Sequence, residues 1–243
     1  RTWEVAESLS KENRRVKTIR RLGERGLATA VVAGWKEAKG DILGVMDGDL
    51  QHRPETLKHL VHAILDTPAD IVIASRHVAH GGVSEWSLVR RLISWGATCL
   101  ATLVVPGVLR NVRDPMSGYF LLRKSVLQSA RLNPTGYKIL LEVLAKGSYR
   151  TVQEVPYIFE ERKEGSSKLG ARQYGEYLLH LARLAKETGE LVRFARFCTI
   201  GFLGVFVNQA VLWFFTEVEN LYYVHSSIIA VEVAIIANFL LND

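Results

Sequence analysis

The pattern of hydrophobic and polar positions divides the chain into two parts. From residue 1 to about 180, short apolar runs alternate with polar stretches of helical character, whereas residues 190–243 are dominated by two long apolar runs. An alternation of helix and strand patterns is typical of α/β layer architectures. The sequence therefore predicts an α/β domain over 1–180 and a separate apolar region over 190–243.

The first part predicts a series of helices and strands. Compact apolar runs predict the strands, Gly40 ends one helix, and Pro54 and Glu55 mark the first turn of the next helix. The expected elements are, in order, a helix end at 3–10, a strand at 16–19, a helix at 27–38, a strand at 42–46, a helix at 54–65, and strands at 71–74 and 152–159. This order is that of a βαβαβ series whose own first strand lies upstream of Arg1.

Two apolar runs near the end of the chain are long enough to cross a bilayer, which takes about 20 residues. Residues 197–216 carry no formal charge, and residues 220–242 carry only Glu232. We therefore predict transmembrane helices at about 196–216 and 221–242. A pair of buried core helices is the alternative for these runs.

The charges that flank these runs predict their orientation. Arg183, Lys186, Arg193 and Arg196 precede the first run, whereas the connector 216–221 has acidic residues and no Lys or Arg. By the positive-inside rule, the large N-terminal part lies in the cytoplasm and the connector lies outside. The sequence thus predicts a multi-pass protein of the cell membrane.

A third stretch lies at about 84–106, and within it residues 86–105 have their two charges, Arg90 and Arg91, at one end and aromatic residues at positions 86 and 95. Its pattern fits a buried helix, a third span or a helix that lies in the membrane interface.

Composition narrows the function classes only slightly. Hydrophobic residues make up 48% of the chain, which excludes a disordered chain, and 31 basic against 25 acidic residues leave a net charge of +6. This basic excess suits nucleic acid, anionic lipid or phosphorylated ligands equally. Cys99 and Cys198 both lie in apolar stretches, so neither a disulfide framework nor a zinc site is expected. Because the chain opens at Arg1 and closes directly after an apolar run, we expect a fragment of a longer protein.

Two carboxylates follow the predicted strand at 42–46. Asp47 and Asp49 flank Gly48, at the sheet edge where open α/β sheets bind ligands. Both can turn toward one hard cation, Mg²⁺ or Mn²⁺, whose coordination shell a substrate phosphate completes, and Gln51 can add an oxygen. The alternative is an ordinary Asp-Gly turn.

These residues belong to a longer string, Asp47–Glu55, that resembles the DxDLQ(H/D)xPE signature of the polyprenol-phosphate glycosyltransferases of glycosyltransferase family 2, the group that contains the dolichol-phosphate mannosyltransferases. Further matching strings follow in the family's order, and the resemblance covers essentially the whole chain. They are Gly23–Ala28 with Gly34, Ala74–Arg76 with Gly81 and Gly82, Arg90–Ser94, Asp114–Gly118 and Arg162–Lys168. The two C-terminal apolar runs, especially NFLLN at 238–242, resemble the first half of a GtrA-like membrane domain.

The resemblance implies the fold. It implies a GT-A, Rossmann-like domain that is truncated at its N-terminus, because the family's first strand and its D-D-G-S nucleotide-binding segment have no counterpart here. We therefore expect incomplete donor binding by this chain. For the stretch at about 84–106, the resemblance favours an interfacial amphipathic helix.

The resemblance and the charges together assign roles to the candidate residues. A lipid phosphate is already a nucleophile, so its site needs guanidinium forks more than a base. The expected groups are Asp47, Asp49 and Gln51 for the metal; Gly26, Leu27, Ala28, Asp47 and Gly48 for the nucleotide; Arg76, Arg90 and Ser94 for the acceptor phosphate; and Asp49, Asp114, Arg162 and Lys168 for catalysis.

Each of these roles has a plainer alternative. The alternative for Arg76 is a salt-bridged surface arginine, and the alternative for Asp114 is an Asx turn. For Arg162 and Lys168 it is an exposed charged loop instead of a lid over the diphosphate. Asp114 itself is expected either to orient an arginine or to act as a base. The histidines show no triad or metal-ligand spacing, and most are expected on the surface.

The predicted function is an inverting transfer of one sugar, with mannose favoured, from GDP-mannose or UDP-glucose to a polyprenyl or dolichyl phosphate at the cytoplasmic membrane face. Nucleic acid is not an expected partner. Three alternatives stay open: a polyprenyl-phosphate glucosyltransferase that uses UDP-glucose, a glycan-elongating enzyme of the same fold that needs Asp114 as a base, and a glycolipid transport or scaffold protein in which Glu232 is functional.

Overall fold

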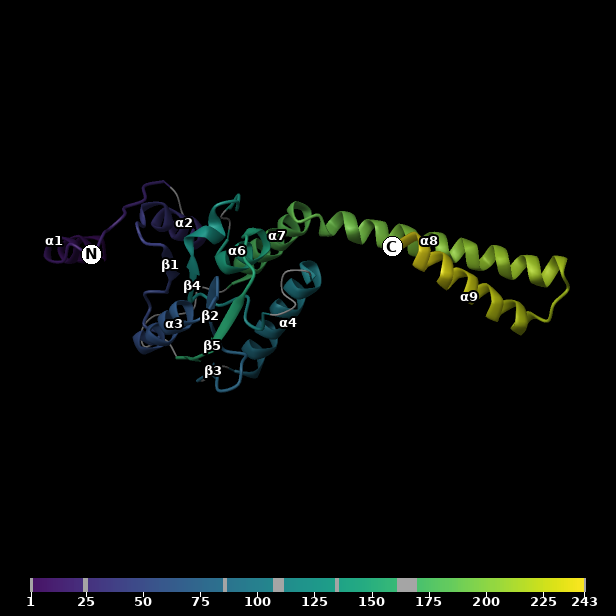
Figure 1. Cartoon of the computed structure of the whole chain (residues 1–243), viewed down its shortest axis with the longest axis horizontal. Coiled ribbons are helices and arrows are strands. Elements are labelled where there is room, and N and C mark those ends of the chain that lie inside the picture. The colour runs from purple at the N-terminus through teal and green to yellow at the C-terminus, as the bar shows by residue number, and fades with distance from the viewer. Residues whose placement is uncertain are drawn as a thin grey trace. The chain divides into compact units, whose positions relative to one another are not determined.

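The computed structural model describes residues 2–23, 26–84, 87–106, 112–133, 136–160 and 170–242. The chain forms two compact units, Arg1–Leu184 and Ala185–Asp243. Figure 1 shows their elements, which are α1 (Thr2–Glu12), α2 (Leu27–Glu37), β1 (Ile42–Val45), α3 (Pro54–Asp66), β2 (Ile71–Ser75), β3 (Gly82–Val83), α4 (Leu88–Val104), β4 (Phe120–Arg123), the short helix η1 (Lys124–Leu127), α6 (Ile139–Lys146), β5 (Val152–Pro156), β6 (Ile158–Phe159), α7 (Ala171–Glu187), α8 (Glu190–Trp213), the π-helical turn η2 (Phe214–Val218) and α9 (Tyr223–Asn242).

A four-stranded sheet forms the centre of the first unit, with the strand order β1-β4-β2-β5. β4 runs antiparallel to both of its neighbours, and β2 pairs with β5 in parallel. Phe120, the first residue of β4, pairs with Val45 near the end of β1 and with Ile73 of β2. The segments that follow β1 and β2 and the segment that precedes β4 therefore meet at one edge of the sheet.

Four of the predicted elements are confirmed to within one residue at their ends, namely α2, β1, α3 and β2, and the helix end at 3–10 belongs to α1. A βαβαβ series usually has adjacent parallel strands, but here β4 inserts between β1 and β2 and runs in the opposite direction. β4 is only four residues long, and three of them are buried. A run this short does not distinguish a strand from other buried segments in the sequence.

The strand predicted at 16–19 is wrong. This segment has no regular secondary structure, and basic side chains within it and just after it, Lys17 and Arg21, contact α2 instead. Lys17 forms an ion pair with Glu37, and the Arg21 guanidinium donates to the hydroxyl of Thr29 (2.7 Å). Because basic residues interrupt its apolar pattern, the segment packs along the helix through side chains rather than through a backbone ladder.

The strand predicted at 152–159 is divided into β5 and β6 at Tyr157. The Tyr157 N–H donates to the carbonyl of Ser75 in β2 (3.1 Å), whereas its carbonyl accepts from the N–H of Gly82 in β3 (3.0 Å). The chain therefore leaves the main sheet at Tyr157 and continues in a two-stranded parallel sheet of β3 and β6.

Helices cover both faces of the main sheet. Every residue of β2 is buried, and its alternate side chains face two separate apolar clusters. Ile71 and Ile73 pack with residues of α6 and α7, whereas Val72 and Ala74 pack with residues of α3. A strand with both faces buried in this way is typical of α/β layers.

α4 has an exposed apolar face. Its N-terminus is capped by Ser87, whose hydroxyl accepts from the N–H of Arg90 (3.3 Å), and the Tyr177 hydroxyl of α7 donates to the carbonyl of Ala97 (2.7 Å). Leu88, Val89, Leu92, Trp95 and Leu103 are all more than 60% exposed. α4 is therefore attached to the first unit along one side and presents large apolar side chains to its surroundings on another.

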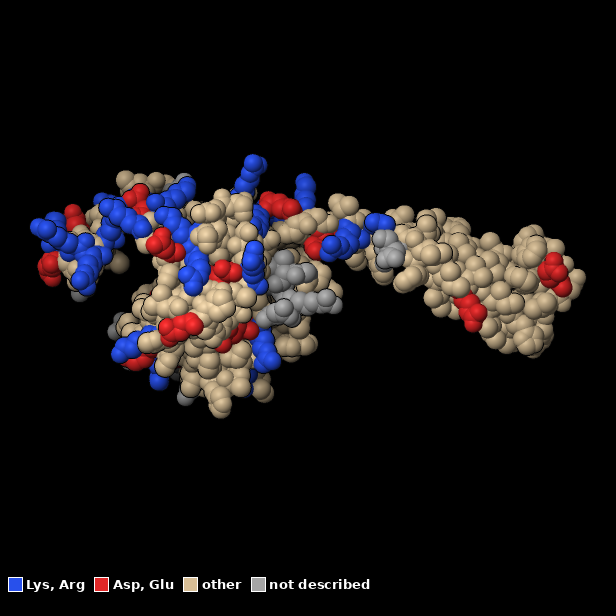
Figure 2. Space-filling view, in the orientation of Figure 1, with Lys and Arg blue, Asp and Glu red and all other residues tan. Residues whose placement is uncertain are grey.

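The second unit is a helical hairpin. The helices 190–218 and 223–241 are long and apolar enough to cross a membrane, with mean hydropathies of 1.7 and 1.9 over an 18-residue stretch of each. Figure 2 shows their surface as almost free of charged side chains, and most of that apolar surface is exposed. Gly204 of α8 lies against Asn238 of α9 so closely that a Cβ atom at Gly204 would lie 2.3 Å from the amide oxygen.

Arg123, the last residue of β4, joins the sheet to α3. Its guanidinium donates to the carbonyls of Ile64 (2.7 Å) and Ala69 (3.0 Å), at and just beyond the C-terminal end of that helix. We predict that Arg123→Met lowers the free energy of unfolding by about 2 kcal/mol, because charge-assisted hydrogen bonds to these carbonyls are lost. Thermal unfolding in detergent measures the change. The exposed Arg131→Met is the control, and equal loss in both variants contradicts the prediction.

Candidate active site

Three segments meet at the edge of the sheet where β1 and β2 end. Asp47 follows β1, Arg76 follows β2, and residues 114–118 lead into β4. The Ser117 hydroxyl donates to the carbonyl of Ala74 (2.7 Å), which attaches the third segment to β2. Candidate residues from three of the predicted motifs are therefore brought to one place by the sheet.

A buried ion pair joins two of these segments. Arg76 donates to the carboxylate of Asp114 three times, through its backbone N–H (3.0 Å), Nε (2.8 Å) and Nη2 (2.7 Å). The two side chains are only 8% and 0% exposed. Neither alternative considered for these residues accounts for this arrangement, because Arg76 is not on the surface and the Asp114 carboxylate is used by an arginine.

The pair fixes the charge of both groups. Burial alone would raise the pKa of Asp114, but the hydrogen bonds and the positive charge of Arg76 hold that pKa below its usual value. Burial alone would lower the pKa of Arg76, but the hydrogen bonds and the negative charge of Asp114 raise that pKa above its usual value. At neutral pH, Asp114 is therefore a carboxylate that accepts hydrogen bonds and has little tendency to take up a proton.

Glu154 of β5 holds the backbone on which Asp114 lies. Its two carboxylate oxygens accept from the N–H groups of Arg113 and Asp114, each at 2.9 Å. The sequence does not single out Glu154, because this residue is 40 positions from Asp114 and belongs to no recognised motif. Only the pairing of β5 with β2 reveals that the two residues meet.

The turn after β1 has a constrained backbone. Leu50 adopts a left-handed conformation with φ of 61°, which is uncommon for a residue with a side chain. An oxygen of Asp49 accepts from the N–H of Gln51 (3.2 Å), and the buried Gln51 side chain donates to the carbonyl of Glu160 (2.9 Å). The turn is thereby attached to the residue that follows β6.

The donor atoms at this turn fit a hard divalent cation. Asp47 and Asp49 are half-buried and two residues apart. Among the described residues there is no cluster of three or more His, Cys, Asp or Glu side chains that is suited to a metal. Two carboxylates with an incomplete set of protein ligands are typical of Mg²⁺ or Mn²⁺ sites that a substrate phosphate completes.

His52 is an unexpected member of this site. The expectation that most histidines lie on the surface is confirmed, since five of the seven are exposed, but His52 and His180 are only 4% and 2% exposed. The His52 ring packs against Tyr119 (4.9 Å between ring centroids) and Phe159 (5.5 Å), and its Nε2 lies 3.5 Å from a carboxylate oxygen of Asp47. The imidazole therefore limits how the Asp47 carboxylate can turn.

Lys138, directly before α6, is a second residue that the sequence analysis missed. Its ammonium donates to the carbonyl of Met116 (2.9 Å), which belongs to the segment that leads into β4. Burial, and to a smaller extent the charge of Arg76, lowers the pKa of Lys138 to about 8, although Asp114 and Asp47 act in the opposite direction. Lys138 thus lies within electrostatic reach of all three segments.

Apart from Gly48, which belongs to the turn after β1, the remaining predicted residues lie on other elements. Gly26 has φ of 137° just before α2, and the half-buried Ser94 follows the exposed Arg90 by one turn of α4. Ala28 is 1% exposed and its N–H donates to the carbonyl of Gly136 (3.4 Å). Leu27 and Gly48 are exposed. Arg162 and Lys168 lie outside the described residues.

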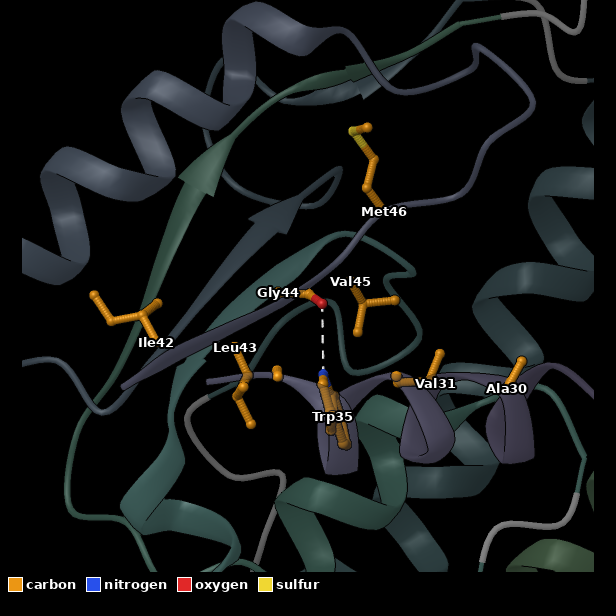
Figure 3. A pocket seen from close by; sticks show the side chains of 10 residues that line it. Ala30, Val31, Trp35, Ile42, Leu43, Gly44, Val45 and Met46 are labelled. Carbon is orange, nitrogen blue, oxygen red and sulfur yellow. Dashed lines mark hydrogen bonds between the residues drawn. The ribbon is translucent and has the colours of Figure 1, made fainter. Parts of the chain in front are cut away.

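An apolar groove of about 420 Å³ lies between α2 and β1, apart from these charged groups (Figure 3). Its lining contains only glycine and apolar residues, and the Trp35 indole donates to the carbonyl of Gly44 (3.4 Å). With no ionisable side chain in its lining, the groove offers no group for acid, base or metal chemistry.

The Arg76–Asp114 pair generates a prediction about stability. Asp114→Asn leaves the guanidinium of Arg76 buried without a counter-charge, so we expect the free energy of unfolding to fall by about 3–5 kcal/mol. Because the folded pKa of Asp114 is depressed, its stabilisation is present above the unfolded pKa of about 3.9 and is lost as pH falls through the lower folded value.

Urea unfolding of wild type and Asp114→Asn at several pH values measures this effect. The difference between their free energies of unfolding is expected to be constant near neutral pH and to shrink below about pH 4. Asp41→Asn, which removes the same charge from an exposed position, is the control. A difference that does not change with pH contradicts the assignment to the ion pair.

Comparisons with known proteins agree with this geometry. Residues 1–130 match the model of glycosyl transferase family 2, and residues 196–243 match the GtrA/DPMS transmembrane domain. The chain is similar in fold to the crystal structure of glucosyl-3-phosphoglycerate synthase from Mycobacterium tuberculosis, with a TM-score of 0.50 and 19% identity over 69% of this chain and 57% of the other. This likeness confirms the predicted GT-A fold class.

Several curated relatives share one type of name. The chain is 45% identical to the dolichol-phosphate mannosyltransferase of Pyrococcus furiosus, over 100% of this chain and 68% of that protein. It is 37% identical to the dolichol-phosphate mannosyltransferase of Saccharomyces cerevisiae (74% and 68%) and 30% identical to the undecaprenyl-phosphate mannosyltransferase of Micrococcus luteus (75% and 76%). The chain belongs to glycosyltransferase family 2 and carries a GtrA/DPMS transmembrane domain.

Proposed function

We propose that this protein transfers mannose from GDP-mannose to a polyprenyl phosphate of the dolichyl type, with inversion at the sugar and with the help of Mg²⁺ or Mn²⁺. The names of its relatives, which are dolichol-phosphate and undecaprenyl-phosphate mannosyltransferases, support mannose as the sugar and a polyprenyl phosphate as the acceptor. Membership of a glycosyltransferase family supports the reaction class.

The observation that carries the choice of acceptor is the state of Asp114. A sugar hydroxyl acceptor needs a base to remove its proton, and an efficient base has a pKa near the working pH. Asp114 is buried, accepts three hydrogen bonds from Arg76 and has a lowered pKa, so it is a poor base. A phosphate monoester needs no base, because it is already an anion with a nucleophilic oxygen. This favours a lipid phosphate over a glycan hydroxyl.

Arg76, Arg90 and Ser94 are the proposed ligands of the acceptor phosphate. Asp114 holds the guanidinium of Arg76 in one orientation, which suits it to position an anion. Arg90 and Ser94 share a face of α4, whose exposed apolar side chains fit the interface of a bilayer. A polyprenyl chain in that bilayer would present its phosphate at the level of this helix.

On the donor side, Asp47 and Asp49 are the residues that would hold the cation, with Gln51 nearby. The bound cation would neutralise the diphosphate as it leaves the sugar. His52 and the bond from Gln51 to Glu160 keep the turn in shape. For Gly26, Leu27, Ala28 and Gly48, contact with the nucleotide remains a prediction. So does the catalytic role of Arg162 and Lys168.

We also propose how the chain is placed in the membrane. An α/β transferase domain extends to about residue 180, and α8 and α9 cross the bilayer as the start of a membrane domain at 190–243. Arg193 and Arg196 begin α8 and the connector after it is acidic, so the transferase domain lies on the cytoplasmic side of a multi-pass protein. There the active site meets cytoplasmic nucleotide sugars.

The function is tested by following labelled sugar from GDP-mannose or UDP-glucose into lipid extracts that contain dolichyl phosphate. We expect product from GDP-mannose, its loss with EDTA, and a fall of at least about 100-fold in Asp49→Ala. Product from UDP-glucose alone would identify a glucosyltransferase instead. Retained transfer in Asp49→Ala contradicts the metal-dependent mechanism, and lipid binding without any transfer favours a scaffold.

Glu154 provides a sharper prediction about geometry. Glu154→Gln can accept only one of the two backbone N–H groups, so the position of Asp114 and Arg76 is less well fixed. We expect mannosyl transfer to fall by about 10- to 100-fold, as when a group that orients a ligand-binding residue is removed.

Asp70→Asn is the matched control. Asp70 also accepts from two backbone N–H groups, those of Arg150 (2.8 Å) and Thr151 (3.1 Å), but it lies at the opposite end of β2. Both bonds go to the same oxygen of Asp70, so Asp70→Asn removes the charge and can keep both bonds, and thermal unfolding measures the stability that each variant loses. If their activities fall equally, the effect of Glu154 is on folding and not on the site.

A further inference from the structure

Lys138 combines a fixed position with an uncompensated charge. Its ammonium donates to the carbonyl of Met116, two residues after Asp114 and two before Gly118. Gly118 lies next to the turn after β1, since a Cβ atom there would be 2.9 Å from a carboxylate oxygen of Asp47. Lys138 is thus anchored to the segment that has the proposed acceptor-phosphate arginine on one side and the proposed cation ligands on the other.

The surroundings of Lys138 do not neutralise it. Within the described part of the chain no carboxylate forms an ion pair with Lys138, and its ammonium lies 5.1 Å from the centroid of the Tyr137 ring. Arg76 repels it, and the nearest acids that act on it are Asp114, which is paired with Arg76, and Asp47. Burial makes the cation less stable than in water, which its lowered pKa of about 8 reflects.

An ammonium in this situation is suited to bind an anion. It has three N–H donors, and Met116 is the acceptor that the described structure shows for them. A phosphate oxygen at the remaining donors would supply both the missing negative charge and the missing hydrogen bonds. Because water is partly excluded here, such a contact is stronger than on an open surface.

We propose that Lys138 is a phosphate-binding residue of the transfer reaction, with its ammonium donating to a phosphate oxygen of a substrate. The proposal rests on the proposed function, because it takes the phosphates from the two substrates of that reaction. The phosphate belongs either to the leaving nucleoside diphosphate or to the polyprenyl monophosphate. The two sources share the same chemistry, and the experiment distinguishes them.

The test compares Lys138→Met and Lys138→Arg with wild type in the intact protein. Lys124→Met is the matched control, because the Lys124 ammonium also donates to a backbone carbonyl, that of Ala38 (3.4 Å), but it lies at the opposite edge of the sheet. One measurement is the dissociation constant of GDP in the presence of Mn²⁺. The other is the KM for dolichyl phosphate at saturating GDP-mannose.

We expect Lys138→Met to raise one of these two constants by about 10- to 100-fold, because a hydrogen bond between charged groups is lost. A change in the GDP dissociation constant assigns Lys138 to the donor, and a change in the KM for dolichyl phosphate assigns it to the acceptor. Lys138→Arg, which keeps the charge, is expected to recover much of the loss. Lys124→Met is expected to change neither quantity.

The proposal is overturned if Lys138→Met leaves both quantities unchanged, or if it lowers only the thermal unfolding temperature, as expected for a residue that only holds the carbonyl of Met116. Failure of the proposed function gives a different result, namely wild-type protein that transfers no sugar to any polyprenyl phosphate. In that case the GDP measurement alone decides on Lys138. An unchanged GDP dissociation constant in Lys138→Met then overturns the proposal.

Discussion

The carboxylate of Asp114 accepts three hydrogen bonds from one arginine, and most features of this edge of the sheet serve to keep that pair buried and aligned. Two charges removed from water need close to complete pairing, or the cost of burying them exceeds their attraction. Two contacts help to keep the pair aligned. The Glu154 carboxylate accepts from the N–H groups of Arg113 and Asp114, and the Ser117 hydroxyl donates to the carbonyl of Ala74 in β2. The guanidinium is therefore available at a defined position with little freedom to turn.

The mixed sheet explains how so few residues form one site. If β1 and β2 were direct parallel neighbours, the segment 114–118 would have no place between their ends. The antiparallel strand β4 brings that segment in from the opposite direction, so that Asp47, Arg76 and Asp114 come from three separate parts of the chain. Tyr157 has a similar role on the other side, because it redirects the chain toward Gln51.

The sequence predicts those features that depend on local patterns. Apolar runs bounded by Gly and Pro predict α2, β1, α3 and β2, and the motif strings single out Asp47, Arg76 and Asp114. What it does not predict are contacts across long sequence distances. Glu154 and Lys138 are ordinary charged residues in the sequence, and His52 looks like a surface residue beside a charged neighbour. Their roles arise only when distant segments are brought together, as in the bond from Lys138 to Met116, a separation of 22 residues, and the bond from Gln51 to Glu160, a separation of 109 residues.

The close fit of Gly204 and Asn238 affects how the helical hairpin can be assembled. The Asn238 amide lies against a residue that has no side chain, in surroundings that are otherwise almost wholly apolar. If α9 shifted by one turn along α8, this amide would face larger side chains and the small gap at Gly204 would be empty. Small and polar residues at such interfaces select one alignment of two helices in a membrane. The pair therefore specifies the register in which the two helices pack, although most of their contacting side chains are apolar and would allow several registers.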